Sequence, residues 1–214
     1  MKRFGTRGPA PARGTVSRMF RLFLGGETQV GETQMDGNQE AASRVTRDEL
    51  ERQWPGPRLT TYPDPVVSAL GLPPVASRVL RELGLPDGVP VLFTAASPSR
   101  APGALPPEAA GAVLVGRVWN DEHALLVVPD ERVLAWHESG ELTAVNTDLE
   151  RYLRFLVCVD AVQERMDAVD SGLVSRGAYE ALVAEQRETM RRADPQALAD
   201  GWWWPGVVDE LLMI

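Results

Sequence analysis

The sequence predicts an α+β domain in which a mainly antiparallel meander sheet of four to five strands is flanked by N-terminal and C-terminal helices. Three observations lead to this prediction. Short apolar runs between residues 112 and 145 are separated by only three or four residues, and connections this short force successive strands to be antiparallel neighbours. Apolar residues recur at helical intervals after residue 149, and a helix-capping pattern precedes the sheet at residue 46.

The N-terminal helices are expected to be short. Thr46 and Glu49 have the spacing of a capping box, which predicts a helix ending near Trp54. A second helix is expected at residues 73–83, where two prolines suit its start and a glycine follows its end. The intervening residues 59–72 read as irregular or partly extended.

The strands are expected from residue 89 onward, where short continuous apolar runs replace the helical spacing of apolar residues. Their predicted ranges are 89–93, 112–119, 123–128, 132–136 and 141–145. A Pro-rich loop, Pro98 to Pro107, separates the first run from the others. The central four strands therefore form the meander, and the first run is expected to be its fifth strand.

The C-terminal part is expected to be helical. A second capping box, Thr147 to Glu150, predicts the start of a long helix that ends before Gly172. A further helix, a short helical turn and a last helix are expected at residues 176–192, at residues 194–195 and after residue 205.

Charge divides the chain unequally. Residues 1–34 hold six basic and two acidic side chains, whereas residues 35–214 hold sixteen basic and twenty-eight acidic ones. The acidic body should repel nucleic acid and anionic membranes and attract a basic partner. Residues 1–42 are poor in apolar side chains and are expected to be a disordered basic tail, with Met35 as our hypothesis for the true first residue. Residues 43–214 are expected to be one domain.

Cysteine usage and hydropathy suggest a cytoplasmic protein. Cys158 is the only cysteine, so the chain cannot close an internal disulfide, and no apolar run approaches the roughly 18 residues of a membrane span. A reducing compartment fits this composition.

The residue types needed for most catalytic schemes are scarce. Two histidines and one cysteine cannot form a common structural zinc site without carboxylates, and neither a phosphate-binding loop nor a Gly-x-Ser-x-Gly elbow occurs. We therefore expect no catalytic, metal-binding or cofactor-binding residues. His137 could act as a base, but we interpret it as a surface histidine beside a turn. A hydrolase that uses His123 or His137 remains a third hypothesis.

Two surfaces are candidates for binding a partner. The first, which we term the acidic rim, consists of Asp121, Glu122, Glu138 and Glu141. These residues fall in two alternate turns of the meander, which share one end of the sheet, and could dock a cationic partner. The alternative is that they are merely solvated turn residues.

The second candidate surface is the tryptophan segment, Trp202, Trp203 and Trp204. Three neighbouring side chains in an irregular segment cannot all face one core, so at least one ring should lie at the surface, where tryptophan often anchors partners. The alternative is that these rings hold the last helix against the body. Trp119 and Trp136 are expected to pack on the faces of the sheet. Nothing in the sequence favours one of the two surfaces over the other.

Two stretches of the chain resemble a known family. The junction Val145, Asn146, Thr147, Asp148, Leu149, running into Tyr152, Leu153, Phe155 and Leu156, resembles the strand-to-helix junction of the SUKH superfamily of bacterial immunity proteins. The segment Asp194, Pro195, Ala197, Leu198, followed by Trp202, Trp203 and an acidic last helix, is similar to the carboxyl end of its fourth family. The chain departs from that family by ending in four apolar residues.

The resemblance implies a non-catalytic cytoplasmic protein that binds and neutralises a cognate polymorphic toxin, often a nuclease or deaminase. It implies no catalytic residues, and the binding surface would vary with the toxin. An acidic body and an absence of catalytic motifs agree with this expectation. The alternative is a regulatory module that binds a peptide or small metabolite between the sheet and the long helix. The oligomeric state is not predicted.

Overall fold

The computed structural model describes residues 44–211 except residues 102, 104 and 174. The expected disordered tail and the hypothesis about Met35 lie outside these residues. The strands are β1 (Leu59–Thr60), β2 (Leu85–Pro86), β3 (Gly88–Val89), β4 (Phe93–Arg100), β5 (Val113–Val118), β6 (His123–Val127), β7 (Val133–His137) and β8 (Leu142–Asn146). The helices are α2 (Arg47–Gln53), α3 (Asp64–Leu70), α4 (Pro74–Arg78), α5 (Leu149–Asp170), α6 (Arg176–Ala193) and α7 (Trp203–Leu211).

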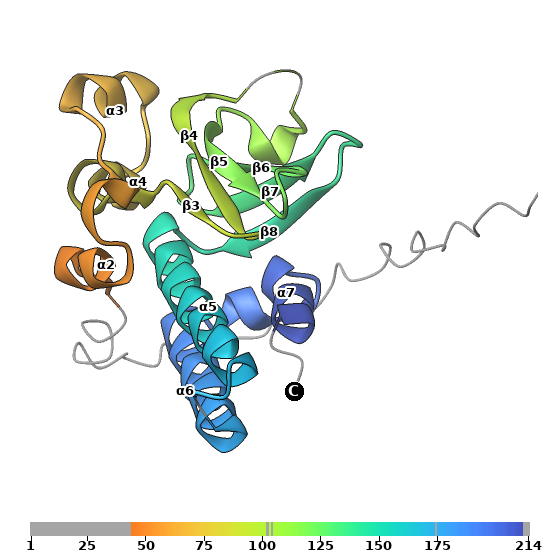
Figure 1. Ribbon diagram of the computed structural model, residues 1–214. Helices are drawn as coiled ribbons and strands as arrows, with labels where there is room; N and C mark the ends of the chain where they lie inside the picture. The colour runs from red at the N-terminus through yellow and green to blue at the C-terminus, as the bar shows by residue number, and fades with distance from the viewer. Residues whose placement is uncertain (1–43, 102, 104, 174, 212–214) are drawn as a thin grey trace, which may run out of the picture. The chain divides into compact units, whose positions relative to one another are not determined.

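The strands form a six-stranded antiparallel meander and a separate two-stranded pair. The order in the larger sheet is β3-β4-β5-β6-β7-β8, so each strand lies beside its sequence neighbours, and β1 pairs with β2 (Figure 1). The predicted α+β class and the four central strands of the meander are confirmed. The sheet has one strand more than the largest number predicted, because β3 and β4 are both present.

The strand expected at residues 89–93 is wrong in its position. Val89 ends β3 and Phe93 begins β4, and residues 90–92 between them form a tight turn in which the Leu92 N–H donates to the Val89 carbonyl oxygen at 3.1 Å. The strand itself continues to Arg100, through residues expected to be loop. Pro98 fits in this strand because the register between β4 and β5 shifts between Ala95 and Ser99, and proline is tolerated where a ladder hydrogen bond is missing.

The two faces of the sheet are covered differently. One face contributes residues such as Val115, Leu125 and Val145 to the main core, which the helices complete. Figure 1 shows α5 and α6 running side by side, with α7 beside α5 near the sheet, and α5 and α7 both contact β8. The opposite face carries a smaller cluster in which Ala124 and Leu126 pack with residues of the loop before β5.

The N-terminal helices follow the sequence only in part. Thr46 caps α2 as predicted, because its hydroxyl oxygen accepts from the Glu49 N–H at 3.2 Å. The second predicted helix is α4 with a π-helical extension, Val79–Leu83. The irregular segment expected at residues 59–72 instead contains α3. Its prolines lie before and within the first turn, where proline is compatible with a helix, and Gly71 ends it with φ of 65°.

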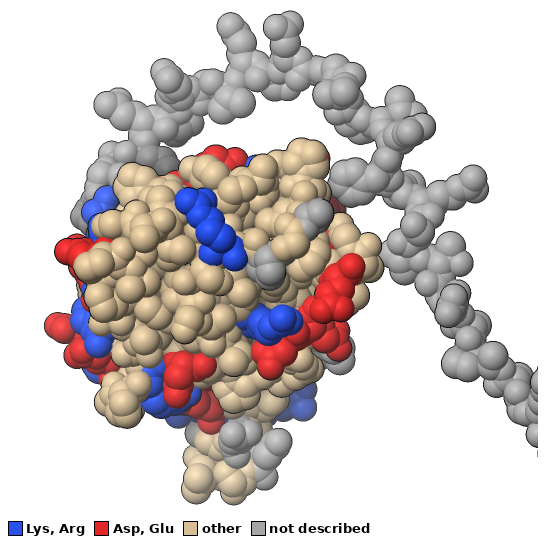
Figure 2. All heavy atoms as spheres, turned by 90° about the horizontal axis from the view of Figure 1, so that it is seen from above, with Lys and Arg blue, Asp and Glu red and all other residues tan. Residues whose placement is uncertain are grey.

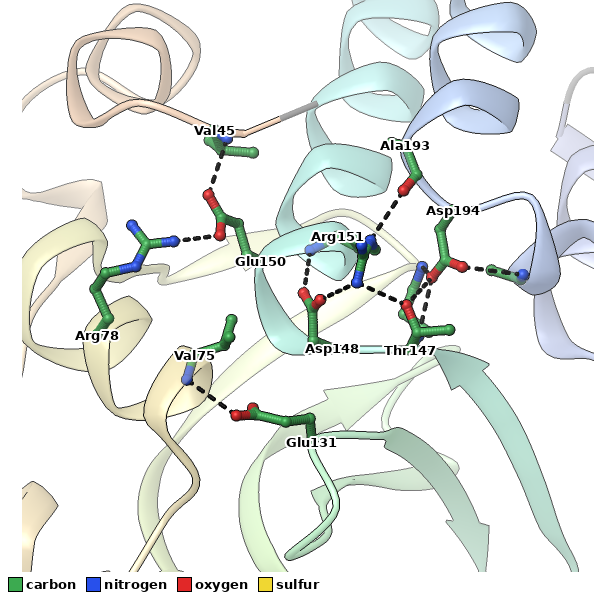
Figure 3. Close-up of polar contacts among 12 residues, drawn as sticks. Val45, Val75, Arg78, Glu131, Thr147, Asp148, Glu150, Arg151, Ala193 and Asp194 are labelled. Atoms are coloured by element: carbon green, nitrogen blue, oxygen red, sulfur yellow. Dashed lines mark hydrogen bonds and ion pairs between the residues drawn. The ribbon is translucent and has the colours of Figure 1, made fainter. Parts of the chain in front are cut away.

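The start of α5 also differs from the prediction. Asp148, rather than Thr147, caps the helix, because its carboxylate accepts from the Arg151 N–H at 2.8 Å (Figure 3). The Glu150 carboxylate binds Arg78 and the Val45 N–H instead of closing a capping box. Contacts with the distant N-terminal segment therefore take precedence over the local motif.

The C-terminal elements agree with the prediction apart from the last boundary. Gly172, with φ of 72°, follows α5, α6 matches its expected range, and Gln196–Leu198 form a 3-10 turn. Helix α7 begins at Trp203, before Pro205, because a proline in the first helical turn removes no hydrogen bond of the helix.

Candidate functional site

The two acidic turns lie at the same end of the sheet, as predicted. The β5–β6 turn holds Asp121 and Glu122, and the β7–β8 turn holds Glu138 and Glu141. His123, the first residue of β6, is paired both with Val118 at the end of β5 and with His137 at the end of β7. All four carboxylate residues of the acidic rim are exposed.

The β5–β6 turn is held in an unusual backbone conformation. Trp119, Asn120 and Asp121 have φ of 53°, 53° and 65°, so three consecutive non-glycine residues are left-handed. The Asn120 N–H donates to the carbonyl oxygen of Val91 at 2.8 Å, and Val91 itself has φ of 68°. A β-branched residue at positive φ is rare, and such strain is retained where surrounding structure imposes it, often at functional sites.

Trp119 packs against the main core, as expected for a residue on a face of the sheet. The left-handed turn begins at this residue, and its ring also packs edge-on against Trp203, with ring centroids 6.3 Å apart. Trp136 lies on the opposite face of the sheet, in the smaller cluster, as expected for face packing.

The tryptophan segment divides into a buried anchor and two half-buried rings. Trp204 is 1% exposed, stacks on Phe155 with ring centroids 5.1 Å apart, and donates from Nε1 to Asn146 Oδ1 at 2.8 Å. Trp202 and Trp203 are half-buried. The sequence offered surface exposure and clamping of the last helix as alternatives, and the structure assigns clamping to Trp204 and partial exposure to its two neighbours.

Trp203 joins the two candidate surfaces into one. Its ring contacts His123, with centroids 4.9 Å apart and an interplanar angle of 75°, in addition to Trp119. A hollow of about 320 Å³ lies at this contact, which we term the Trp203 pocket; its lining residues are Trp119, Glu122, His123, Trp203, Gly206 and Val207. The tryptophan segment and part of the acidic rim thus border the same hollow.

Sequence reasoning did not place four lining residues of this pocket in a binding surface: Trp119, His123, Gly206 and Val207. The available signal for His123 and Trp119 was their position on either side of the acidic turn, next to a strand end. Gly206 lies one turn from Trp203 on α7, and its role depends on where the helix starts, which was predicted incorrectly.

Charge at the pocket is negative near neutral pH. Burial, followed by the nearby His137, lowers the pKa of His123 from its ordinary value, while Glu122 and Glu141 oppose that shift. His123 is therefore mostly uncharged at neutral pH and leaves the carboxylate of Glu122 uncompensated within the pocket lining. Arg117 donates to the Asp121 carbonyl oxygen at 3.0 Å, but it is paired with Ala124 and shares the opposite face of the sheet.

The imidazole rings of the two histidines lie close together at the ends of β6 and β7, with centroids 5.0 Å apart. His137 lies beside the β7–β8 turn, where its Nδ1 accepts from the Ser139 N–H at 3.2 Å and lies 2.8 Å from the Ser139 hydroxyl oxygen. Both contacts are between residues two positions apart and shape an exposed turn. Within the described residues, no group of three or more His, Cys, Asp or Glu side chains is arranged to hold a metal ion.

The space between the long helix and the sheet, which the ligand-binding alternative requires, is filled by side chains. Tyr152 and Phe155 of α5 are at most 1% exposed. Tyr152 packs edge-on against Phe93 of β4, with ring centroids 5.8 Å apart. Among the helices that the structure describes, none combines the length and apolar character needed to cross a bilayer.

Buried polar residues hold α7 and its tryptophans in place. The Asp194 carboxylate accepts from Asn146 Nδ2 at 3.0 Å, from the Thr147 N–H at 2.9 Å and from the Thr147 hydroxyl at 3.1 Å (Figure 3). Asn146 in turn accepts from Trp204. These contacts join the end of β8, the end of α6 and the start of α7, and therefore fix the helix that carries Trp203.

Figure 2 shows the face opposite the protruding ends of α5 and α6. That face is largely uncharged, and acidic side chains on it lie close to basic ones in several places. It therefore offers no single-sign surface to a charged partner.

Residues 45–210 match the sequence model of the family described as SUKH-4 immunity protein. No curated protein matches the chain. No solved structure matches it either.

Proposed function

The chain belongs to the SUKH-4 immunity protein family, and we propose from this membership that it binds and neutralises a cognate polymorphic toxin of the nuclease or deaminase type. It does so in the cytoplasm by covering a functional surface of the toxin, and it performs no chemistry itself. The toxin is a basic protein, attracted by the acidic body of residues 35–214.

We further propose that the toxin binds at the end of the sheet formed by the acidic rim and Trp203. The observation that carries this proposal is the contact of Trp203 with His123 and Trp119, which places an accessible indole beside the acidic β5–β6 turn. Tryptophan at the centre of an interface with charged residues around it is the usual distribution of binding energy. The acidic rim would then set the rate of association and Trp203 the rate of dissociation.

The function is tested by capture and reconstitution. The full chain is immobilised, lysate of the source organism is passed over it at low and then high salt, and retained proteins are identified by mass. We expect one stoichiometric partner with a basic carboxyl-terminal domain. That domain, expressed alone, should arrest bacterial growth, and co-expression of the chain should restore it. A purified partner whose toxicity is unchanged by the chain would contradict the proposal.

The acidic rim is tested by removing its charge. The variant Asp121→Asn, Glu122→Gln, Glu138→Gln, Glu141→Gln should associate with the toxin more slowly and lose most of its dependence on salt. A control variant removes the same charge elsewhere, through glutamine at Glu82, Glu108, Glu164 and Glu185, all of which are exposed. Equal association rates for the two variants would show that only the overall charge matters.

Trp203 is tested by truncation. Trp203→Ala should increase the dissociation rate more than the association rate falls, since it removes a contact that forms only in the docked complex. The free energy of unfolding is measured in parallel. Weaker binding that follows a loss of stability would indicate that Trp203 only supports α7.

A further inference from the structure

The composition of the Trp203 pocket points to a particular kind of side chain from the partner. Two indole rings, those of Trp119 and Trp203, lie nearly perpendicular to each other at 85° in its lining. A carboxylate, that of Glu122, lines the same hollow, and no lysine or arginine does. Aromatic surface next to an unpaired carboxylate attracts a cation, through the electrons of the ring face as well as through charge.

The shape of this combination favours arginine over lysine. A guanidinium is planar and can stack on an indole while its N–H groups donate to a carboxylate. It is also less strongly hydrated than an ammonium group and enters a partly apolar hollow more readily. The net negative charge of residues 35–214 favours a cationic occupant further.

We propose that the Trp203 pocket receives an arginine side chain of the protein partner, stacked against indole and hydrogen-bonded to Glu122. This assignment rests on the proposed function, because it specifies the residue by which a basic toxin is anchored. It specifies one contact within a surface where attraction between opposite charges alone would not fix how the partner is oriented.

Gly206 keeps the pocket open. It is an exposed residue within α7, and a Cβ atom added to it would meet no atom within 4 Å. Glycine at an exposed helical position is less favourable than most residues, so nothing in the packing of the helix requires it. Because Gly206 lines the hollow, a side chain added there would occupy open space at the pocket without displacing the fold. This residue therefore offers a way to fill the pocket while leaving the rest of the surface unchanged.

The first test uses small probes on the full chain. Nα-acetyl-arginine methylamide and its citrulline analogue, which has a similar shape without the charge, are titrated at constant ionic strength. The indole N–H signals of Trp119 and Trp203 are followed by NMR, after assignment by single Trp→Phe variants. The corresponding lysine derivative, Nα-acetyl-lysine methylamide, is titrated in the same way. We expect saturable shifts of the indole signals with the arginine probe in the millimolar range, smaller shifts with the lysine probe and none with the citrulline probe. Equal responses to arginine and citrulline, or no response up to tens of millimolar, would overturn the assignment.

The second test fills the pocket. Gly206→Leu should abolish the response to the arginine probe without lowering the thermal unfolding temperature. Gly177→Leu is the matched control, because Gly177 is also an exposed helical glycine with open space around it, in α6, and it should leave the response intact. Glu122→Gln, at an exposed position, should weaken the response several-fold even if Gly206→Leu proves poorly folded. A well-folded Gly206→Leu protein with an unchanged response would refute the pocket.

The purified toxin separates this inference from the proposed function. Gly206→Leu should raise the dissociation constant for the toxin by about tenfold or more, as expected for loss of a central anchor. Neutralisation that survives Gly206→Leu unchanged overturns the arginine pocket and leaves the immunity function in place. If the chain binds the arginine probe but neutralises no toxin, the arginine pocket is supported and the proposed immunity function is overturned.

Discussion

Replacing Asp194 by alanine should be among the most damaging single changes that leave the apolar core intact. Asp194 is 2% exposed, and one of its oxygens accepts three hydrogen bonds of 2.9 to 3.1 Å from Asn146 and Thr147. Asn146 is fully buried. In Asp194→Ala, the Asn146 amide and the Thr147 N–H lose their acceptor, the first at a fully buried residue and the second at a half-buried one.

The magnitude follows from these lost bonds. A buried donor left without a partner costs about 1–3 kcal/mol, and two such donors remain, since the Thr147 hydroxyl can rotate. Removing a buried carboxylate recovers part of its own desolvation cost. We therefore expect a loss of about 2–4 kcal/mol, a substantial part of a typical stability of about 5–15 kcal/mol. For a domain of this size, that lowers the unfolding temperature by about 6–12 °C.

The measurement is urea unfolding, followed by far-UV circular dichroism and by indole fluorescence. Asp130→Ala is the matched control, because Asp130 also accepts three hydrogen bonds, all from Arg132, but its side chain is 58% exposed. The control should lose less than about 1 kcal/mol. If both variants lose the same free energy of unfolding, burial does not make the hydrogen bonds of Asp194 more stabilising than those of the exposed Asp130. That result would refute the reasoning.

Three further predictions follow from single residues. Burial, and after it His137, lowers the pKa of His123. The unfolded chain therefore binds more protons than the folded chain below about pH 6.5, and the free energy of unfolding should decline as the pH falls through this range. In urea titrations at several pH values, His123→Gln should reduce that decline. Burial raises the pKa of Cys158 to about 12, so a thiol reagent should label it only at the rate at which the fold opens. Gly116→Ala would place a Cβ atom in steric overlap with the Phe93 ring, and we expect a loss of about 1–3 kcal/mol in thermal unfolding.

The central sheet could be predicted from sequence because its information is local. Strands β5 to β8 are linked by turns too short for any but antiparallel neighbours, and their residues form short apolar runs bounded by turn residues. The predictions failed where contacts between residues far apart in the sequence determine the local structure. Glu150 has the spacing of a capping-box residue, yet it binds Arg78 and the Val45 N–H, and no pattern within one segment could reveal those partners.

The candidate site could be predicted only in pieces. The shared end of the two acidic turns followed from the meander, since alternate turns must lie together. The position of Trp203 next to His123 did not, because it depends on how α7 packs on the sheet. That packing is set by Trp204, whose burial against Phe155 and bond to Asn146 are tertiary contacts. Composition cannot show which of two adjacent tryptophans is buried and which is partly exposed.

These supports also indicate how the surface should behave when it binds. On the side of the sheet, the Asn120 N–H donates to the Val91 carbonyl oxygen and fixes the left-handed β5–β6 turn. On the side of α7, the buried bond from Trp204 to Asn146 fixes the helix next to Trp203. Both walls of the Trp203 pocket are thus held by hydrogen bonds, one between exposed residues on the side of the sheet and one buried beneath α7. A pre-organised surface loses little conformational entropy on docking, so we expect the free and bound backbones to differ little here and mutations in the pocket to act mainly on dissociation.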